Sequence, residues 1–172
     1  YRKQELVNEQ DTNRLARGIS ADTIVQSKVE ATEGHKEHPT ANEAGDDKWS
    51  EPDVPFAAKY PKNHVYESES GHIQEFDDTD GAERIHTYHK AGTFEEIHPD
   101  GSKVVKVVGD DYELLLGKKF VHISGNVNVV VDGQSTFYVK GDSDIQVDGN
   151  VKQVVGGNVE QEVAGNVKVD AD

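Results

Sequence analysis

Nine glycines recur at intervals of eight residues through residues 101–172, and this period constrains the fold more than any other feature. A fixed short period indicates one small structural unit that is stacked repeatedly, rather than a compact globule. Asn or Asp follows most of these glycines, so we expect each pair to form a corner in which the glycine has positive φ. The predicted corner residues are Gly101, Gly109, Gly117, Gly125, Gly133, Gly141, Gly149, Gly157 and Gly165.

Each eight-residue unit, here called an octad and counted from its glycine, has an apolar residue at position seven. Positions three and five are often apolar as well, as at Val127 and Phe137. A spacing of two is the period of a β-strand, so positions three, five and seven are predicted to line one buried face. Positions four and six then point outward. The predicted core residues at position seven are Val107, Leu115, Ile123, Val131, Val139, Val147, Val155 and Val163.

Short strands of this kind must close on themselves, because an open stack leaves backbone hydrogen bonds unmade. Three octads make one triangular turn, and two arrangements fit the period. One chain coils alone with about 24 residues per turn, or three chains intertwine so that each contributes one face per layer. Nine octads give three coils in the first arrangement and nine layers in the second. We expect the trimer, although the period alone does not exclude the single-chain coil.

Residues 1–62 carry no repeat and form a predicted N-terminal segment and linker. A short helix ending at Gly18 and a strand over residues 21–29 are expected. From Glu30 to Pro61 the chain is rich in Glu, Gly, Asn, Asp and Pro, which is typical of a linker laid over a neighbouring surface. Trp49, Phe56 and Tyr60 are interleaved with prolines. We expect them to dock this linker on a partner domain or on the repeat region; the alternative is that they are ordinary buried aromatics.

Residues 63–100 are predicted to form a β-meander at the root of the repeat region. Apolar and polar residues alternate around Ile73 and again around Ile85, and DDTDGAE, KAGT and PDG are turn sequences between the runs. The predicted fold class is therefore all-β: an intertwined homotrimeric triangular β-helix over residues 101–172, preceded by a β-meander and an extended linker.

The run SGHIQEFDDTDGAERIHTYHKAGTFEEIHPDGS, followed by valine-glycine octads, resembles the central spike (needle) proteins of contractile phage tail baseplates. It is also similar to the valine-glycine repeat spikes of type VI secretion. The segment WSEPDVPFAAKYPKNHVYE is similar to the phage members in particular. The resemblance implies an intertwined homotrimer below the baseplate hub, preceded in the whole protein by an OB-fold domain and, in some members, by a lysozyme domain. Residues 1–30 are then at most the tail of that OB fold.

Candidate chemistry within the chain is weak. His72, His86, His89 and His98 lie close in sequence, but His86 and His89 point to opposite faces of a regular strand and cannot share a metal. We expect surface histidines or pairs across a hairpin. The acidic DDTDG segment lacks the spacing and the terminal glutamate of an EF-hand. No nucleophile motif, phosphate loop or cysteine is present. We therefore predict no catalytic, cofactor or metal site and no enzymatic activity within this chain.

Charge and hydropathy limit the partners of the chain. The net charge is −15, which argues against nucleic acid and anionic membranes as equilibrium partners. No apolar run of membrane-spanning length and no signal-peptide pattern is present. The sequence opens at Tyr1 and contains no methionine, so we expect the natural chain to start upstream. Asp172 is the last residue of a complete octad, so we expect the repeats either to continue past it or to carry a separate cap.

A thin closed prism with a dry valine core is stiff and resists local unfolding. This stiffness suits a puncturing needle, and the resemblance implies that the needle is the central spike of a virion tail baseplate, made in the host cytoplasm. The expected partners are further copies of the chain, a hub protein at the N-terminal end, a small tip protein at the C-terminal end and, transiently, the host envelope. The alternatives are a receptor-binding or adhesive trimeric fibre, and a carrier for a lysozyme domain outside this chain.

Overall fold

The computed structural model describes residues 37–40 and 48–169. Within these ranges the chain is all-β: every regular element is a strand and no residue is helical, which confirms the predicted fold class at this level. The helix expected before Gly18 and the strand expected over residues 21–29 lie outside the described residues. In the same ranges, no helix long and apolar enough to cross a membrane is found.

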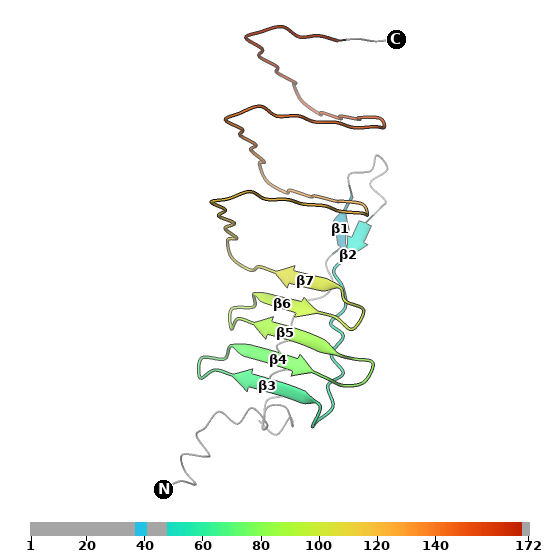
Figure 1. Ribbon diagram of the computed structural model, residues 1–172, viewed down its shortest axis with the longest axis vertical. Helices are drawn as coiled ribbons and strands as arrows, with labels where there is room; N and C mark the ends of the chain where they lie inside the picture. Colours follow the sequence, from blue (N-terminus) through green and yellow to red (C-terminus); the bar gives the residue numbers. More distant parts are fainter. Residues whose placement is uncertain (1–36, 41–47, 170–172) are drawn as a thin grey trace. The chain divides into compact units, whose positions relative to one another are not determined.

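Five strands form one antiparallel sheet in the order of the sequence (Figure 1). They are β3 (Asn63–Glu67), β4 (Ile73–Asp77), β5 (Arg84–Tyr88), β6 (Phe94–Ile97) and β7 (Lys103–Lys106). This is the predicted meander, but its fifth strand lies inside the first octad. The sheet therefore continues past the predicted boundary at residue 100.

Three of the four hairpins use the same turn. In each, a glycine N–H donates to the carbonyl oxygen three residues earlier: Gly71 to Ser68, Gly92 to His89 and Gly101 to His98. The φ angles of these glycines are +88°, +104° and +82°. A tight turn that ends in a left-handed residue matches the twist of the flanking strands, and glycine adopts that conformation without steric cost. These glycines therefore fix the lengths of the strands in the meander.

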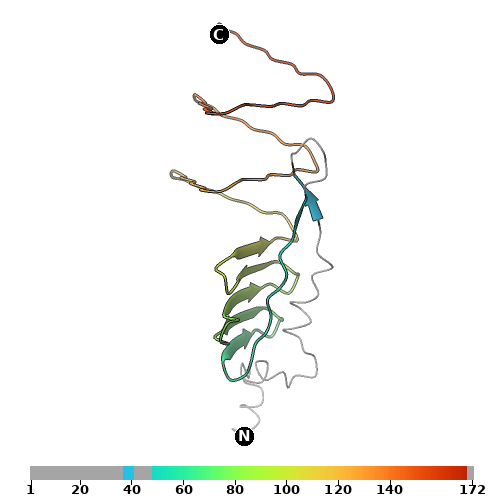
Figure 2. The ribbon, with the colours of Figure 1, turned by 90° about the vertical axis from the view of Figure 1, so that its right-hand side faces the viewer.

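Residues 51–60, which we call the strap, cross one face of this sheet from β7 to β3. At one end Glu51 Oε2 lies 3.2 Å from Lys106 Nζ on β7. In the middle Val54 and Phe56 pack against the buried pair Val65 and Ile73. At the other end the Lys59 N–H donates to Thr79 Oγ1 at 2.9 Å. Figure 2 shows the strap, in teal, running along the sheet until it turns into β3.

A small hairpin precedes the strap. The strands β1 (Glu37–Pro39) and β2 (Lys48–Ser50) pair in antiparallel register, with His38 opposite Trp49. Their rings stack with centroids 4.4 Å apart. The predicted linker thus contains a two-stranded element that sequence analysis did not anticipate, because each strand is only three residues long.

Contacts divide the chain into two units, residues 1–132 and residues 133–172. From Val107 to Val169 this single chain contains no strand, in either unit. The octad glycines from Gly109 to Gly165 also lack the positive φ that we predicted; only Gly101 has it. The physical reason is that Gly101 closes a hairpin, which reverses the chain, whereas the later corners only redirect it and an ordinary φ suffices.

Candidate functional surfaces

The strap covers a face of the sheet that carries charged as well as apolar side chains. Glu75, His86 and Glu96 lie opposite one another on β4, β5 and β6, and each is at most 1% exposed. Arg84 and Asp77 form the neighbouring cross-strand pair and are 2% exposed. Strand alternation places these five side chains on one face. The strap and the sheet therefore enclose a buried charged cluster.

Arg84 is the centre of this charged cluster. Its Nη1 donates to Glu96 Oε2 at 2.6 Å, and its Nη2 contacts Glu75 Oε2. Phe56 of the strap lies over the guanidinium, with the ring centroid 5.0 Å from Cζ. A guanidinium can hydrogen-bond to carboxylates in its plane while an aromatic ring covers its face. Arg84 therefore links two strands of the sheet to the strap.

Glu96 also meets two histidines. Its Oε2 lies 2.7 Å from His86 Nδ1, and its Oε1 lies 2.9 Å from His98 Nε2. Burial by itself raises the pKa of Glu96, but the hydrogen bond with His86 and the charge and hydrogen bond of Arg84 outweigh it and hold the pKa below its ordinary value. Glu96 is therefore ionised in the folded chain at neutral pH.

The pKa of Glu75 is shifted in the opposite direction to that of Glu96. Burial raises the pKa of Glu75 above its ordinary value, and the nearby charge of Asp77 adds to the rise, while Arg84 only partly offsets it. The pKa values of the two carboxyl groups thus shift in opposite directions, because Glu96 has hydrogen bonds with both His86 and Arg84 whereas Glu75 lies near the like charge of Asp77.

The expectation of surface histidines is wrong for His86, which is 1% exposed. It is buried because it lies between Glu75 and Glu96 beneath the strap. His72 and His89 do form a pair across a hairpin, with ring centroids 4.4 Å apart. Among residues 37–40 and 48–169, no group of three or more histidine, aspartate or glutamate side chains has the arrangement of a metal site.

The opposite face of the sheet is open and carries an apolar row. Phe76, Ile85 and Ile97 lie opposite one another on β4, β5 and β6. Phe76 is 46% exposed and Ile85 is 42% exposed. Val105 on β7 belongs to the same face and is also exposed. Large apolar side chains gathered on one open face mark an interaction surface.

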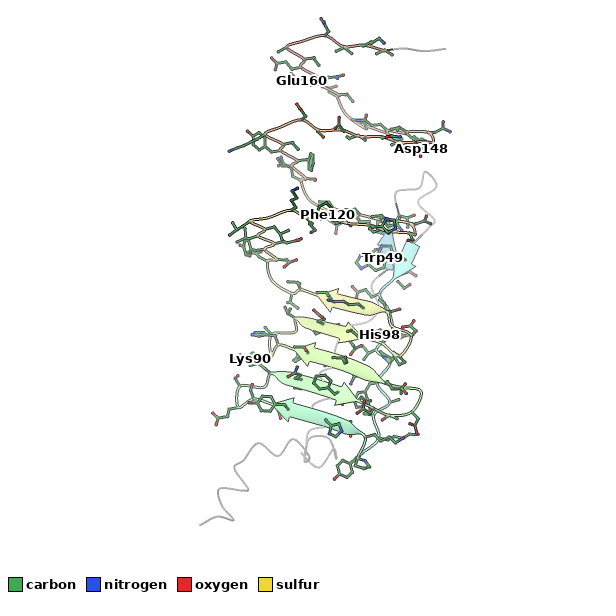
Figure 3. All side chains as sticks on the ribbon, in the orientation of Figure 1. Trp49, Lys90, His98, Phe120, Asp148 and Glu160 are labelled. Carbon is green, nitrogen blue, oxygen red and sulfur yellow. The ribbon has the colours of Figure 1, made fainter. Side chains whose placement is uncertain are left out.

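The predicted core residues of the octads are exposed in the single chain. The side chains at position seven are all about half exposed, and those at positions three and five are more exposed still. Figure 3 shows the side chains along this part of the chain, with Phe120, Asp148 and Glu160 labelled. At every octad glycine from Gly109 to Gly165, an added Cβ would meet no atom within 4 Å. Nothing in this single chain therefore covers the predicted core or requires glycine at these corners.

The three predicted docking aromatics have different surroundings. Phe56 packs on the core and on Arg84, as described above. Trp49 is 43% exposed and helps to line a cavity of about 140 Å³ between the strap and β7. Tyr60 is 50% exposed and begins a turn through the cis Tyr60–Pro61 bond.

Sequence analysis missed the charged cluster, although a signal for it was present. Ile73 and Phe76 are three residues apart on one strand, so they must lie on opposite faces. The same holds for Phe94 and Ile97 on β6. A sheet with apolar residues on both faces needs cover on both, and the strap supplies it on one face.

Comparison with known proteins identifies two phage relatives. The chain is 47% identical over 154 residues to "Protein Gp5" of Vibrio phage KVP40, in an alignment that covers 75% of this chain and 36% of the relative. It is 40% identical over 86 residues to the "Pre-baseplate central spike protein Gp5" of Enterobacteria phage T4, which covers 45% of this chain and 15% of that protein.

The chain thus spans about a third of the length of the first relative and less of the second. No family model matches the sequence. The two relatives confirm the resemblance seen in the meander and the octads. By sequence, this chain is a homologue of the phage central spike proteins.

Proposed function

We propose that this chain is a structural component of a phage tail baseplate in the virion, and that three copies intertwine into a triangular β-helix that punctures the host cell envelope. The names of its relatives support a baseplate role. The octad period and the surfaces of the chain support the more detailed proposal.

One observation carries the trimer: the residues expected in the core are exposed in the single chain. Val147 at position seven is 51% exposed and Ile145 at position five is 87% exposed. A single-chain coil would bury position seven within one chain. Three intertwined chains bury it between copies instead, and the released apolar surface stabilises the assembly.

The open face of the sheet continues this core. Val105 is position five of the first octad, and it shares a face with Phe76, Ile85 and Ile97. In the trimer, that apolar row and the octad core form one buried surface around the threefold axis. The charged cluster beneath the strap then lies on the outer side.

The glycine period supports the same arrangement. Glycine is needed where another backbone approaches closely, and no atom of this chain approaches the corners from Gly109 to Gly165. Neighbouring copies turning at the same layer supply that approach. A corner without a side chain lets three chains meet at each edge of the prism.

The proposed partners are a baseplate hub protein on the N-terminal side and a small tip protein on the C-terminal side. An octad stack that ends leaves strand edges unpaired, which supports a covering partner wherever the stack stops. The envelope is contacted transiently during penetration. The net charge of −15 disfavours nucleic acid as a partner.

The mass of the particle in solution tests the trimer. Light scattering is expected to give three times the mass of one chain. Val147→Asp is expected to abolish the trimer, because three carboxylates would be buried near one axis at a cost of several kcal/mol each. Gln146→Asp is the matched control, since position six points outward, and it is expected to leave the mass unchanged. A monomeric wild-type chain would overturn the intertwined β-helix.

Enzymatic activity is a separate matter, and we propose that it is absent from this chain. Glu75 and Glu96 pair with Arg84 beneath the strap, and a general acid needs access to substrate. Purified residues 1–172 are expected to release no soluble fragments from peptidoglycan, with a lysozyme as the positive control. Turnover above the blank would place catalysis within this chain. A lysozyme domain elsewhere in the intact protein is compatible with this proposal.

A further inference from the structure

In the second octad, residues 109–116, apolar residues occupy the outward positions and acidic residues occupy two inward positions, which is the reverse of the usual pattern. Its outward positions four, six and eight are Tyr112, Leu114 and Leu116, whereas its inward positions three and five are Asp111 and Glu113. No other octad has large apolar residues at all three outward positions. The inward Glu113 is compensated, because its Oε2 lies 2.6 Å from Lys119 Nζ in the next octad. No contact within the octad accounts for the apolar side chains at its outward positions.

The first octad shows which side of the chain these outward positions face. Val104 and Lys106 are its positions four and six, and both are partly covered by the strap. Lys106 Nζ lies 3.2 Å from Glu51 Oε2. Positions four and six therefore face the strap side of the sheet, whereas Val105 at position five faces the open side. If the alternation continues, Tyr112 and Leu114 belong to the strap side as well.

The strap side next to β7 is incompletely filled. A cavity of about 140 Å³ is lined there by Trp49, Pro52 and Val54 on one side and by Phe94 and residues 104–106 on the other. The lining is mostly apolar and the cavity is open to solvent on one side, so an apolar side chain of another copy can enter it. Trp49, at its rim, is 43% exposed.

Within a trimer, a neighbouring copy supplies the next layer. The chain turns at Gly109 and leaves the face to which β7 belongs, so the strand that follows β7 on that face comes from another copy. By threefold symmetry that strand is the second octad of a neighbour. Its outward apolar side chains, Leu114 at 90% exposure among them, then meet the strap side beside Trp49.

We propose that the segment from Trp49 to Val54 of each copy packs on the outward apolar face of the second octad of a neighbouring copy, with Leu114 at the cavity beside Trp49. This contact rests on the proposed trimer and adds to it. The strap then joins neighbouring copies on the outer surface, independently of the core around the axis.

The single tryptophan of the chain reports on this contact directly. In the trimer of residues 1–172, Trp49 emission is expected at short wavelength and protected from acrylamide. In a Leu114→Gln/Leu116→Gln variant, emission is expected to shift to longer wavelength and acrylamide quenching to increase. Tyr138→Gln is the matched control: it also changes an outward position, but in the fifth octad, and is expected to leave both signals unchanged.

The chain has no native cysteine, so engineered pairs provide a second measurement. Pro52→Cys combined with Leu114→Cys is expected to form disulfides between copies, seen as linked chains on a denaturing gel without reductant. Pro52→Cys combined with Tyr138→Cys is expected to form none. A disulfide requires Cα atoms within about 7 Å, so linkage is a sensitive test of proximity.

The outcomes separate this inference from the trimer itself. A trimer by light scattering whose Trp49 is equally accessible in all variants, and which forms no disulfide, overturns the contact but not the trimer. A shielded Trp49 that does not respond to Leu114→Gln/Leu116→Gln assigns its cover to another segment and also overturns the contact. A monomer overturns both. If the Leu114→Gln/Leu116→Gln variant fails to assemble, the engineered cysteine pairs alone test the contact between copies.

Discussion

Two glutamates in the same cross-strand row affect stability in opposite ways as the pH changes. Glu96 has a folded pKa below its ordinary value of 4.5, so it contributes stability above that pH, and this contribution is lost as the pH falls through the folded pKa. Glu75 has a folded pKa above 4.5, so its burial is most favourable at low pH and the stability falls as the pH rises from 4.5 to the folded pKa.

Neutralising each glutamate should reveal this difference. At pH 7, Glu96→Gln is expected to lower the free energy of unfolding by about 3–5 kcal/mol, because Arg84 and the histidines lose an ionised partner in a buried site. The loss should shrink as the pH falls below 4.5. Urea unfolding at a series of pH values measures it.

Glu75→Gln is the internal comparison. Its stability relative to wild type should improve as the pH rises from 4.5, because only the wild type then buries an ionised carboxylate at this position. A relative stability that moves in the same direction as that of Glu96→Gln would contradict the assignment of opposite pKa shifts.

At the scale of elements, the strap covers one face of the five-stranded sheet without being a strand. It is held on that face by a few contacts that lie far apart: one ion pair at β7, two apolar side chains in the middle and one backbone hydrogen bond at Thr79. Phe56 contributes both to the apolar contact and to the cover of Arg84. Loss of this one side chain should therefore loosen the whole strap.

Phe56→Ala is expected to destabilise the chain by about 1–3 kcal/mol, since the ring is partly buried and its removal also exposes Arg84 to water. Limited proteolysis should become faster within residues 51–60. Ala57→Ser, at an exposed neighbouring position, is the control and should behave like wild type. Equal cleavage rates in the two variants would mean that Phe56 does not hold the strap.

At the scale of the whole molecule, the octads provide two surfaces whose composition changes along the chain. At outward positions four and six, the second octad has Tyr112 and Leu114, whereas the sixth octad has Asp144 and Gln146. Position seven, which is predicted to point inward, stays apolar in every octad through Val163, and position three is valine in the last three octads. The last octads thus have a solvated exterior and an apolar position seven, and the strand edge that follows them is covered either by further octads or by another protein.

A fragment that keeps residues 141–172 is expected to recover a small tip protein from virion lysates, whereas one truncated after Asp132 should not. Removal of the last octads removes the triangular end on which such a protein would lie. Both fragments keep the meander, so proteins that bind there are recovered equally. Equal recovery of every protein by the two fragments would argue against a tip partner.

The meander was predictable because each of its turns contains a glycine and because strand alternation is visible around Ile73 and Ile85. The charged cluster was not predictable in the same way. Glu75, Arg84 and Glu96 are far apart in sequence, and their charges are typical of a solvated face unless a distant segment covers them. That segment, the strap, has no strand pattern. Its position on the sheet depends on contacts between residues far apart in sequence, such as the one between Phe56 and Arg84.

The course of the strap determines how a mechanical load enters the sheet. Any pull on the chain upstream of Glu51 first reaches the sheet at Lys106 on β7, although β3 is the first strand in sequence. A pull away from the sheet would break the contacts one after another, from Lys106 past Phe56 to Thr79. A pull along the strap would load them together in shear. In the peeling direction, β7 therefore bears the load first, and β3 bears it only after the strap has come off the sheet.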